Sequence, residues 1–587
     1  MQKKTIMNPF NHNYFLGYIN EVTPQYVKIH FPSSNLLDTF CYKGVFYAGG
    51  NVGNFVVVEG EEYGFLARII EINLPDSEKK EISEKAIQYD NTTFHPSGKA
   101  ELLLSFSVFE PQKTQKTVSK YPAIGAKVYA CSDEQIEIYV KEFGKKENEA
   151  DNVYAEIGKL TSNDAKCNVS LNALFGRHCA IVGTTGGGKS WTVAKLIELV
   201  VQETRNKVIL IDATGEYEKL SGKSLIFGKN SFFHYSNLTV NDLMVLLKPG
   251  GQVQAPKLLE AIKSLKILKK LEEVVNKDQG VKLSENGYQV EINPGLYEDI
   301  RVNNGAVIKN NQLMRPYNRF YSKYILDIDN PSANFDIKKL DSQLINECVW
   351  DNDTNRWGTR QDNQLNHCSS LILRARSLIN NPDFSSIFGF NCSIDDEMEI
   401  SKSINSFLKS EDQLLRLSFN NVSSDFQVRE ILVNALGKLL LNKSIVGEFK
   451  INPVIVFMDE AHRFLNKNVK DEYFEARPLD SFDLIAKECR KFGLFLCLAT
   501  QMPRDIPIGT LSQMGTFIVH RLINELDKKS IENAASSANR SALSFLPILG
   551  EGEALLVGVD FPMPLMIKIN EPINKPESNT PRLTKTN

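Results

Sequence analysis

A glycine-rich octet carries the strongest chemical signal in the sequence. It reads Gly183-Thr184-Thr185-Gly186-Gly187-Gly188-Lys189-Ser190 and has the pattern G-x-x-x-x-G-K-S. It follows an apolar run at 179–182 and precedes an amphipathic stretch, which is the strand-to-helix context of a phosphate-binding loop. Backbone N–H groups would bind phosphate oxygens, Lys189 would neutralise the β- and γ-phosphates, and Ser190 would hold Mg²⁺. The octet therefore predicts a site for ATP and Mg²⁺, and we count the adjacent Trp191 among its nucleotide contacts.

Two neighbouring carboxylates end another apolar run, in PVIVFMDEAHRFL. In a P-loop enzyme, one acid at such a strand end holds Mg²⁺ and the second polarises the attacking water. We assign Asp459 to the metal and Glu460 to the role of catalytic base. An apolar run that ends in two acids is a common strand end, so this assignment depends on the presence of the P-loop.

Other polar residues follow predicted strands of the same kind. KVILIDATGEY reaches Asp212 and continues to Glu216, and LFLCLATQ ends at Thr500 and Gln501. Because ligands gather at the carboxyl ends of parallel strands, we expect these residues around the γ-phosphate. Glu216 is predicted to contact the nucleotide and Gln501 to sense phosphate or orient water. A simple polar strand cap is the alternative for Gln501.

Three arginines are candidates for offsetting the charge that spreads over a transferring phosphoryl group. Arg177 lies just before the P-loop strand, and Arg490 lies in IAKECRKFG, just before the LFLCLATQ strand. Arg521, after TFIVH, has weaker support. Each arginine could equally form an ion pair at the protein surface. His462, which follows the two acids, could couple the nucleotide state to DNA or simply pack at the start of a helix.

The elements that must position these residues form two patterns. Up to about residue 140, short runs rich in Val, Ile, Tyr and Phe predict a small closed or nearly closed β-barrel. From about residue 159, the order strand, glycine loop, helix, strand indicates a parallel α/β sheet. We predict a barrel at 1–155, a P-loop ATPase at 156–226 and 451–570, a mainly helical insertion at 227–450, and a flexible tail at 571–587.

Composition excludes several classes of protein. The 587 residues contain 68 Lys plus Arg and 71 Asp plus Glu, so the chain is neither histone-like nor an acidic tail, and any nucleic-acid surface is local. No apolar run approaches the ~20 residues that cross a bilayer, and the N-terminus lacks the apolar core of a secretory signal. The nine cysteines include no C-x-x-C pair. We expect a cytoplasmic protein with reduced thiols and no membrane contact.

The combination of motifs resembles the HerA group of the HerA and FtsK superfamily of RecA-like translocases. The resemblance is carried by RHCAIVGTTGGGKS, IDATGEY, VIVFMDEAH, IAKECRKFGLFLCLATQ and LPILGEGEALLVG, after a β-rich module similar to the HAS-barrel. It implies an α/β fold with a HAS-barrel-like domain before a RecA-like ATPase. It further implies a homo-hexameric ring with ATP sites at subunit interfaces, duplex DNA in the central pore, and catalytic arginines at positions that match Arg177 and Arg490. Many relatives have D-P-H-G-E-Y where this chain has DATGEY, so no role for that histidine carries over.

The resemblance also implies a separate partner, either a nuclease or a sirtuin-like NAD-hydrolysing effector, in DNA end processing or anti-phage defence. We find no second catalytic motif in the chain itself. A two-lobed DExH helicase is disfavoured because too few residues follow Gln501 for a second lobe. A non-translocating, ATP-dependent scaffold or switch that regulates a toxic effector stays open as an alternative.

Overall fold

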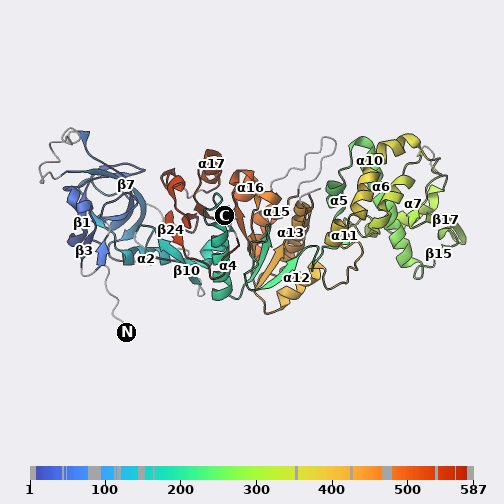
Figure 1. The fold of residues 1–587 in the computed structure, drawn as a ribbon, viewed down its shortest axis with the longest axis horizontal. Helices are drawn as coiled ribbons and strands as arrows, with labels where there is room; N and C mark the ends of the chain where they lie inside the picture. Colours follow the sequence, from blue (N-terminus) through green and yellow to red (C-terminus); the bar gives the residue numbers. More distant parts are fainter. Residues whose placement is uncertain are drawn as a thin grey trace, which may run out of the picture.

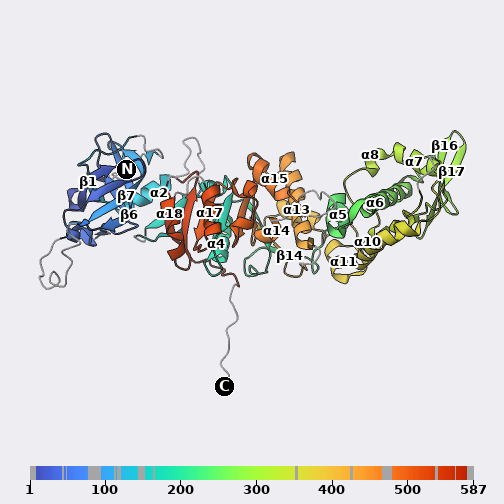
Figure 2. The ribbon, with the colours of Figure 1, turned by 90° about the horizontal axis from the view of Figure 1, so that it is seen from above.

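The barrel, the α/β sheet and the helical part follow one another along an elongated molecule (Figures 1 and 2). In this computed structural model the β-barrel lies at one end, the sheet in the middle and the helical part at the other end. The structure describes residues 8–42, 45–47, 49–76, 94–111, 114–115, 120–142, 153–162, 165–350, 355–423, 427–465, 479–535, 540–561 and 563–577.

The N-terminal strands close into a barrel, as the sequence predicts. Their order is β2-β1-β9-β5-β6-β7, and a further pairing of β2 with β7 completes the circle. Alternate residues point inward, and Leu16, Ile29, Val56 and Phe65 belong to the barrel's own apolar core. The strands are β1 (Phe15–Val22), β2 (Val27–His30), β5 (Phe55–Val58), β6 (Tyr63–Asn73), β7 (Ser97–Ser107) and β9 (Lys127–Ala130); α2 (Asp133–Glu142) follows them.

The central sheet has the order β11-β10-β24-β23-β22-β12-β21-β20-β13-β19-β14. The strands from β22 to β14 are parallel, and the remaining four form an antiparallel extension at one edge. Its strands are β10 (Tyr154–Leu160), β11 (Lys166–Ser170), β12 (Cys179–Val182), β13 (Lys207–Asp212), β14 (Lys223–Ile226), β19 (Leu414–Ser418), β20 (Val454–Met458), β21 (Leu494–Thr500), β22 (Thr516–His520), β23 (Glu553–Gly558) and β24 (Leu565–Ile569).

Helices cover both faces of the parallel strands. Ile181 of β12 packs in the same apolar cluster as Ile197 of α4, whereas Val182 belongs to the cluster that contains Leu432 of α13. The strands are therefore buried on both sides, which explains their continuous apolar runs. The covering elements include α4 (Lys189–Glu203), α13 (Val428–Val446), α15 (Ser481–Glu488), the 3₁₀ turn η7 (Cys489–Phe492), α16 (Ile508–Leu511) and α17 (Glu525–Ala534).

The barrel and the sheet share a core. Phe55, Leu66 and Leu104 of the barrel lie in the same apolar cluster as the residues beneath α4. The fully buried Arg68 donates to Glu101 at 3.1 Å and to the carbonyl of Pro564 at 3.4 Å, so the barrel also has a polar bond to the segment before β24. The barrel is thus packed against the central sheet, and the predicted α/β fold class is confirmed.

The helical part leaves the sheet after β14 and returns at β19. It contains α5 (Val240–Leu247), α6 (Gly251–Val274), α7 (Met314–Lys323), α8 (Ile325–Ile328), α9 (Leu340–Asn346), α10 (Asp362–Asn380), α11 (Pro382–Phe388) and α12 (Ile400–Lys409), with a small sheet of β15 (Val281–Ser284), β16 (Gly287–Asn293), β17 (Leu296–Asn303) and β18 (Ala306–Val307). β19 and α13 fall within the 227–450 stretch that we assigned to the insertion, yet β19 pairs with β13 and β14 in the central sheet. A five-residue strand between helices gives little local signal of its own.

A buried ion pair organises the helical part. Lys309 lies 2.6 Å from Glu347, and both side chains are almost fully buried. Ser264 and Gln343 donate to the other Glu347 oxygen at 2.7 and 2.8 Å, so the carboxylate is fully hydrogen-bonded. Among the residues described above, no helix has the length and apolar character needed to span a bilayer.

Candidate active site

The P-loop connects β12 to α4 in a conformation that depends on glycine. Gly186 and Gly188 have φ of 75° and 104°, and a Cβ at Gly188 would lie 3.0 Å from the Cα of Gly552. The ammonium of Lys189 bonds the carbonyl of Thr184 across the loop at 3.1 Å. Burial lowers the pKa of Lys189, while the nearby carboxylates of Glu460, Asp459 and Glu216 act in the opposite direction. The loop therefore places one buried cation beside three acids.

Those acids come from two other strand ends. Asp459 and Glu460 follow β20 and are buried, and Glu216, after β13, accepts a hydrogen bond from the Ser190 hydroxyl at 3.0 Å. Burial, with the charges of Glu460 and Glu216, raises the pKa of Asp459 to about 7. One Asp459 oxygen, Oδ2, is buried without a hydrogen-bond partner. A hard divalent cation prefers such an oxygen, so the residues present fit Mg²⁺.

A chain of hydrogen bonds connects the predicted base to the P-loop. Gln501 donates to Glu460 Oε1 and accepts from the Thr185 hydroxyl at 2.6 Å. On the other side of Glu460, His462 Nδ1 lies 3.2 Å from Oε2. Burial lowers the pKa of His462. Glu460 has φ of +48°, a strained conformation for a non-glycine residue that is typical of functional sites.

The loop that carries Glu216 is held by Asp212, and Asp212 is bonded by Arg416, a residue that the sequence did not indicate. Asp212 is fully buried and accepts hydrogen bonds from the backbone of Gly215 at 2.8 Å and from Arg416 at 3.1 Å. Burial raises the pKa of Asp212, and those bonds and the Arg416 charge oppose the shift. Arg416 lies on β19, on the far side of the helical part in sequence, so only the folded sheet brings it to Asp212.

His520 is a second residue that sequence reasoning missed. It is fully buried at the end of β22, with Nε2 2.8 Å from the Thr192 hydroxyl and Nδ1 2.8 Å from the carbonyl of Glu553. Burial lowers its pKa to about 4, so the ring is neutral near pH 7; Nδ1–H donates to the carbonyl and Nε2 accepts from Thr192. A Cβ at Gly183 would lie 2.6 Å from the Cβ of His520. The imidazole therefore forms the floor of the P-loop. The sequence did offer one indication of His520, because it is a polar residue at the carboxyl end of a predicted strand. At that strand end we considered only Arg521.

The candidate arginines lie at two different edges of the sheet. Arg521 follows β22, and its carbonyl accepts from the backbone N–H of Thr184 at 3.0 Å. Arg177 and Arg490 instead precede β12 and β21, at the amino ends of the strands. A seven-residue strand such as β21 is about 23 Å long, so these two arginines lie far from the P-loop of their own chain. Arg177 pairs with Asp560 at 2.8 Å, and Arg490 is exposed.

The C-terminal residues lie along α4 beside the site. Asn574 N–H donates to Glu198 at 2.7 Å, Glu577 N–H donates to the carbonyl of Glu216 at 2.8 Å, and the Lys575 ammonium lies 4.9 Å from the centre of the Trp191 ring. Of the predicted tail at 571–587, residues 578–587 lie outside the described residues. The first part of the tail therefore contacts the nucleotide-binding region.

The chain is similar in sequence to known helicases. Residues 155–350 match the family model described as "Helicase HerA, central domain". The chain is 27% identical to the DNA double-strand break repair helicase HerA of Sulfurisphaera tokodaii over 441 residues, 73% of this chain and 71% of that protein. It is 24% identical to the probable helicase MJ1565 of Methanocaldococcus jannaschii over 544 residues, 89% of this chain and 86% of that protein.

Solved structures with a more distant likeness include the bacterial conjugative coupling protein TrwBdeltaN70 and VirB4 of Thermoanaerobacter pseudethanolicus. Each is 13% identical, with TM-scores of 0.40 and 0.41. The matches cover 74% and 73% of this chain and 98% of each of those chains.

The roles of Lys189 and Glu460 can be separated by substitution. Lys189→Ala removes the only ammonium of the P-loop, and we expect ATP turnover to fall by about 10²–10³-fold or more. Glu460→Gln keeps the shape of the side chain but cannot accept a proton, so nucleotide binding should persist while turnover stops. Steady-state ATPase assays and nucleotide titrations measure both effects. Turnover near the wild-type rate in Glu460→Gln would show that another group is the base.

The position of the His520 ring beneath the P-loop predicts an effect on the affinity for ATP. His520→Ala removes the partner of the Glu553 carbonyl and one of two partners of the Thr192 hydroxyl, and it frees the P-loop to move. We therefore expect about tenfold weaker ATP binding, equivalent to ~1.4 kcal/mol. His520→Gln retains a donor and an acceptor and should recover part of the loss. His367→Ala, at an exposed histidine of α10, is the matched control. Equal affinities for His520→Ala and His367→Ala in equilibrium titrations would contradict the assignment.

Proposed function

Since the chain is a P-loop ATPase of the HerA type, we propose that it is a DNA translocase or helicase driven by hydrolysis of ATP with Mg²⁺. The observation that carries the proposal is the cluster of Lys189, Ser190, Asp459, Glu460 and Gln501 at one edge of the sheet. Two relatives are named DNA double-strand break repair helicase HerA, which supports DNA as the substrate.

Each residue of the cluster has a distinct task in this proposal. Lys189 and the N–H groups of the P-loop bind the phosphates, and Ser190 and Asp459 hold Mg²⁺, which offsets negative charge on the phosphates when bound. Glu460 accepts the proton of the attacking water. Gln501 bonds Glu460 and Thr185, so it fixes the position of the base relative to the P-loop.

We propose that the active site is completed by a neighbouring copy in a homo-hexameric ring. Arg177 and Arg490 lie at the amino ends of the strands, where they can reach a P-loop only in another subunit. A head-to-tail contact of this kind joins two different surfaces and closes into a ring when its rotation permits.

Exposed apolar side chains at both edges of the sheet support such a contact. Near the amino ends, around the C-terminus of α13, Ile445, Val446 and Ile451 are exposed. At the carboxyl ends, the segments after β21 and β22 expose another set: Met502, Ile508, Ile523 and Leu526. Large apolar side chains that gather on a surface are typical of protein interfaces.

The substrate proposal is tested by adding duplex DNA to an ATPase assay. We expect ATP turnover to rise severalfold, because a translocase couples hydrolysis to its track, and we expect displacement of a third strand annealed to the duplex. Glu460→Gln is the control for hydrolysis-driven displacement. Turnover that does not respond to DNA, in a protein that still hydrolyses ATP, would favour the scaffold or switch that regulates a toxic effector.

A mixing experiment tests the arginines. Arg490→Ala subunits have an intact P-loop, and Lys189→Ala subunits have an intact arginine, so mixed rings form some complete sites. Random 1:1 mixing should restore about a quarter of wild-type turnover if the arginine acts across a head-to-tail interface. The same mixture with Arg177→Ala shows whether that residue also acts in trans. Absence of recovery in mixed rings, whose formation native mass spectrometry confirms, would contradict action across the interface.

We further propose that the barrel docks a separate enzyme, a nuclease or a sirtuin-like NAD-hydrolysing effector, in DNA end processing or anti-phage defence. The barrel has no part in the nucleotide site, and its surface exposes Phe109, Tyr121 and Ile124. Tyr121 lines a surface hollow of about 850 Å³. A cytoplasmic location agrees with cysteines that are unpaired among the described residues.

Truncation tests the docking role. A chain that starts near Gly158 should keep ATP binding, since all nucleotide contacts named above lie after that residue, but should lose the partner in co-purification from the native host. Ring formation by the shortened chain, checked by native mass, is the necessary control. If the truncated ring still binds the partner, the docking surface lies on the ATPase part and the proposal for the barrel is wrong.

A further inference from the structure

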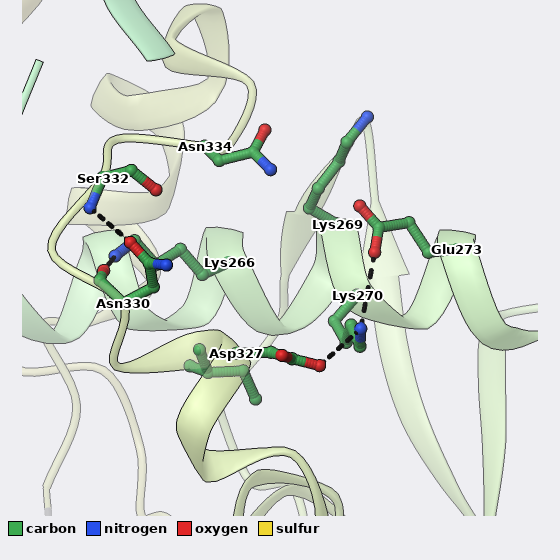
Figure 3. A pocket seen from close by; sticks show the side chains of 9 residues that line it. Lys266, Lys269, Lys270, Glu273, Asp327, Asn330, Ser332 and Asn334 are labelled. Atoms are coloured by element: carbon green, nitrogen blue, oxygen red, sulfur yellow. Dashed lines mark hydrogen bonds and ion pairs between the residues drawn. The ribbon is translucent and has the colours of Figure 1, made fainter. Parts of the chain in front are cut away.

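A small polar pocket lies in the helical part, at a distance from the nucleotide site along the chain (Figure 3). Its volume is about 210 Å³. One wall is α6, which contributes Lys266, Lys269 and Lys270, and the opposite wall is the segment after α8, which contributes Asn330, Ser332 and Asn334. None of these side chains takes part in the proposed ATPase chemistry.

The three lysines differ in how their charge is compensated. Lys270 pairs with Asp327 at 2.6 Å and lies 3.6 Å from Glu273. Lys266 is only 7% exposed, and its ammonium donates to the carbonyl of Asn330, a neutral acceptor. Within the described part of the chain, neither Lys266 nor Lys269 has a carboxylate at ion-pair distance. The pocket therefore has three lysines and two carboxylates in its lining, and both carboxylates lie at ion-pair distance from Lys270, which leaves Lys266 and Lys269 without a close counter-charge.

Burial of Lys266 makes this arrangement costly without an anion. Burial lowers the pKa of Lys266, and the more distant charge of Asp329 opposes the shift. An ammonium has three N–H donors, and one of them is used by the Asn330 carbonyl. An anion in the pocket would supply both the missing charge and further acceptors.

We propose that this pocket binds a phosphate group, with Lys266 and Lys269 as its charged donors and Ser332 and Asn334 as its neutral donors. The two lysines are three residues apart and so lie on one face of α6, on the same side as the pocket. Lysine binds phosphate as a compact point charge, and the hydroxyl and the amide add directional hydrogen bonds.

A second hollow indicates what kind of molecule carries the phosphate. It has a volume of about 570 Å³, shares Lys266 and Asn330 with the first pocket, and adds Lys263 one turn earlier on α6. The carboxylates Glu260 and Asp329 also line it, as does Lys438, which pairs with Asp242. The lysines of α6 thus form a row that continues along the helix, which suits consecutive phosphates of a DNA backbone better than one small ion. The DNA assignment rests on the proposed function, whereas the phosphate site itself does not.

The test compares two pocket variants with a matched control. Lys266→Met with Lys269→Met removes both charges and keeps apolar stems in the buried position; Lys269→Glu reverses one exposed charge and leaves the buried lysine untouched. Lys282→Met, at an exposed lysine of β15 outside the pocket, makes the same charge change as one Met substitution. The full chain is titrated with fluorescent duplex DNA at several salt concentrations. We expect both pocket variants, but not Lys282→Met, to bind 5–10-fold more weakly, with the salt slope reduced by about one.

A second measurement separates a DNA phosphate from a small one. Thermal melting of Lys189→Ala protein, which lacks the P-loop ammonium, is followed with added inorganic phosphate. Stabilisation by phosphate that the pocket substitutions abolish, with unchanged DNA affinity, assigns the site to a small phosphate compound. If the pocket variants match Lys282→Met in both measurements, the proposal is overturned. Failure of the wild-type chain to bind DNA would contradict the proposed function alone, because the phosphate titration still decides on the pocket.

Discussion

The structure depends on a concentration of buried charge at the carboxyl edge of the parallel strands. Asp459, Glu460 and Glu216 place three carboxyl groups there beside the single ammonium of Lys189. Buried charges are costly unless they are paired, and here the acids outnumber the base. Burial raises the pKa of Asp459, the charges of Glu460 and Glu216 add to the shift, and one Asp459 oxygen has no hydrogen-bond partner. Binding of a divalent cation and of phosphates would lower the electrostatic cost of these buried groups.

Such a site can be maintained only if the backbone around it is rigid. Backbone bonds tie the P-loop to two neighbouring strands, through the carbonyls of Thr500 and Arg521. His520 fills the space beneath the glycines, and Gly552 approaches the loop from the antiparallel side of the sheet. The antiparallel extension is therefore part of the nucleotide site, although none of its strands carries a predicted catalytic residue. It limits how far the P-loop can move, both by the close approach of Gly552 and by hydrogen bonds from the Gly552 N–H to the Gly187 carbonyl and from His520 to the Glu553 carbonyl.

The sequence predicted those parts of the site whose signal is local. The loop at 183–190 and the acids at 459–460 directly follow apolar strands, so the strand-then-ligand pattern was enough to find them. Arg416 and His520 escaped notice because their roles arise from contacts across more than a hundred residues, with Asp212 and Thr192 respectively. The barrel was predictable from its alternating strands. The membership of β19 in the central sheet was not, because pairing with β13 is a property of the fold and not of LLRLS alone.

The path of the chain through β14 and β19 determines how the helical part is connected to the central sheet. These two strands are adjacent and parallel at the edge of the sheet, and the whole segment between them departs from one and returns through the other. The helical part is therefore attached through two neighbouring strands and through α13, whose Lys438 pairs with Asp242 of α5 at 3.0 Å. One of the two strands carries Arg416, whose guanidinium bonds Asp212 at the start of the loop that presents Glu216 to Ser190. A load applied at the far end of the helical part is therefore transmitted to β14, β19 and α13, and on β19 it reaches Arg416, whose hydrogen bond to Asp212 adjoins the nucleotide site.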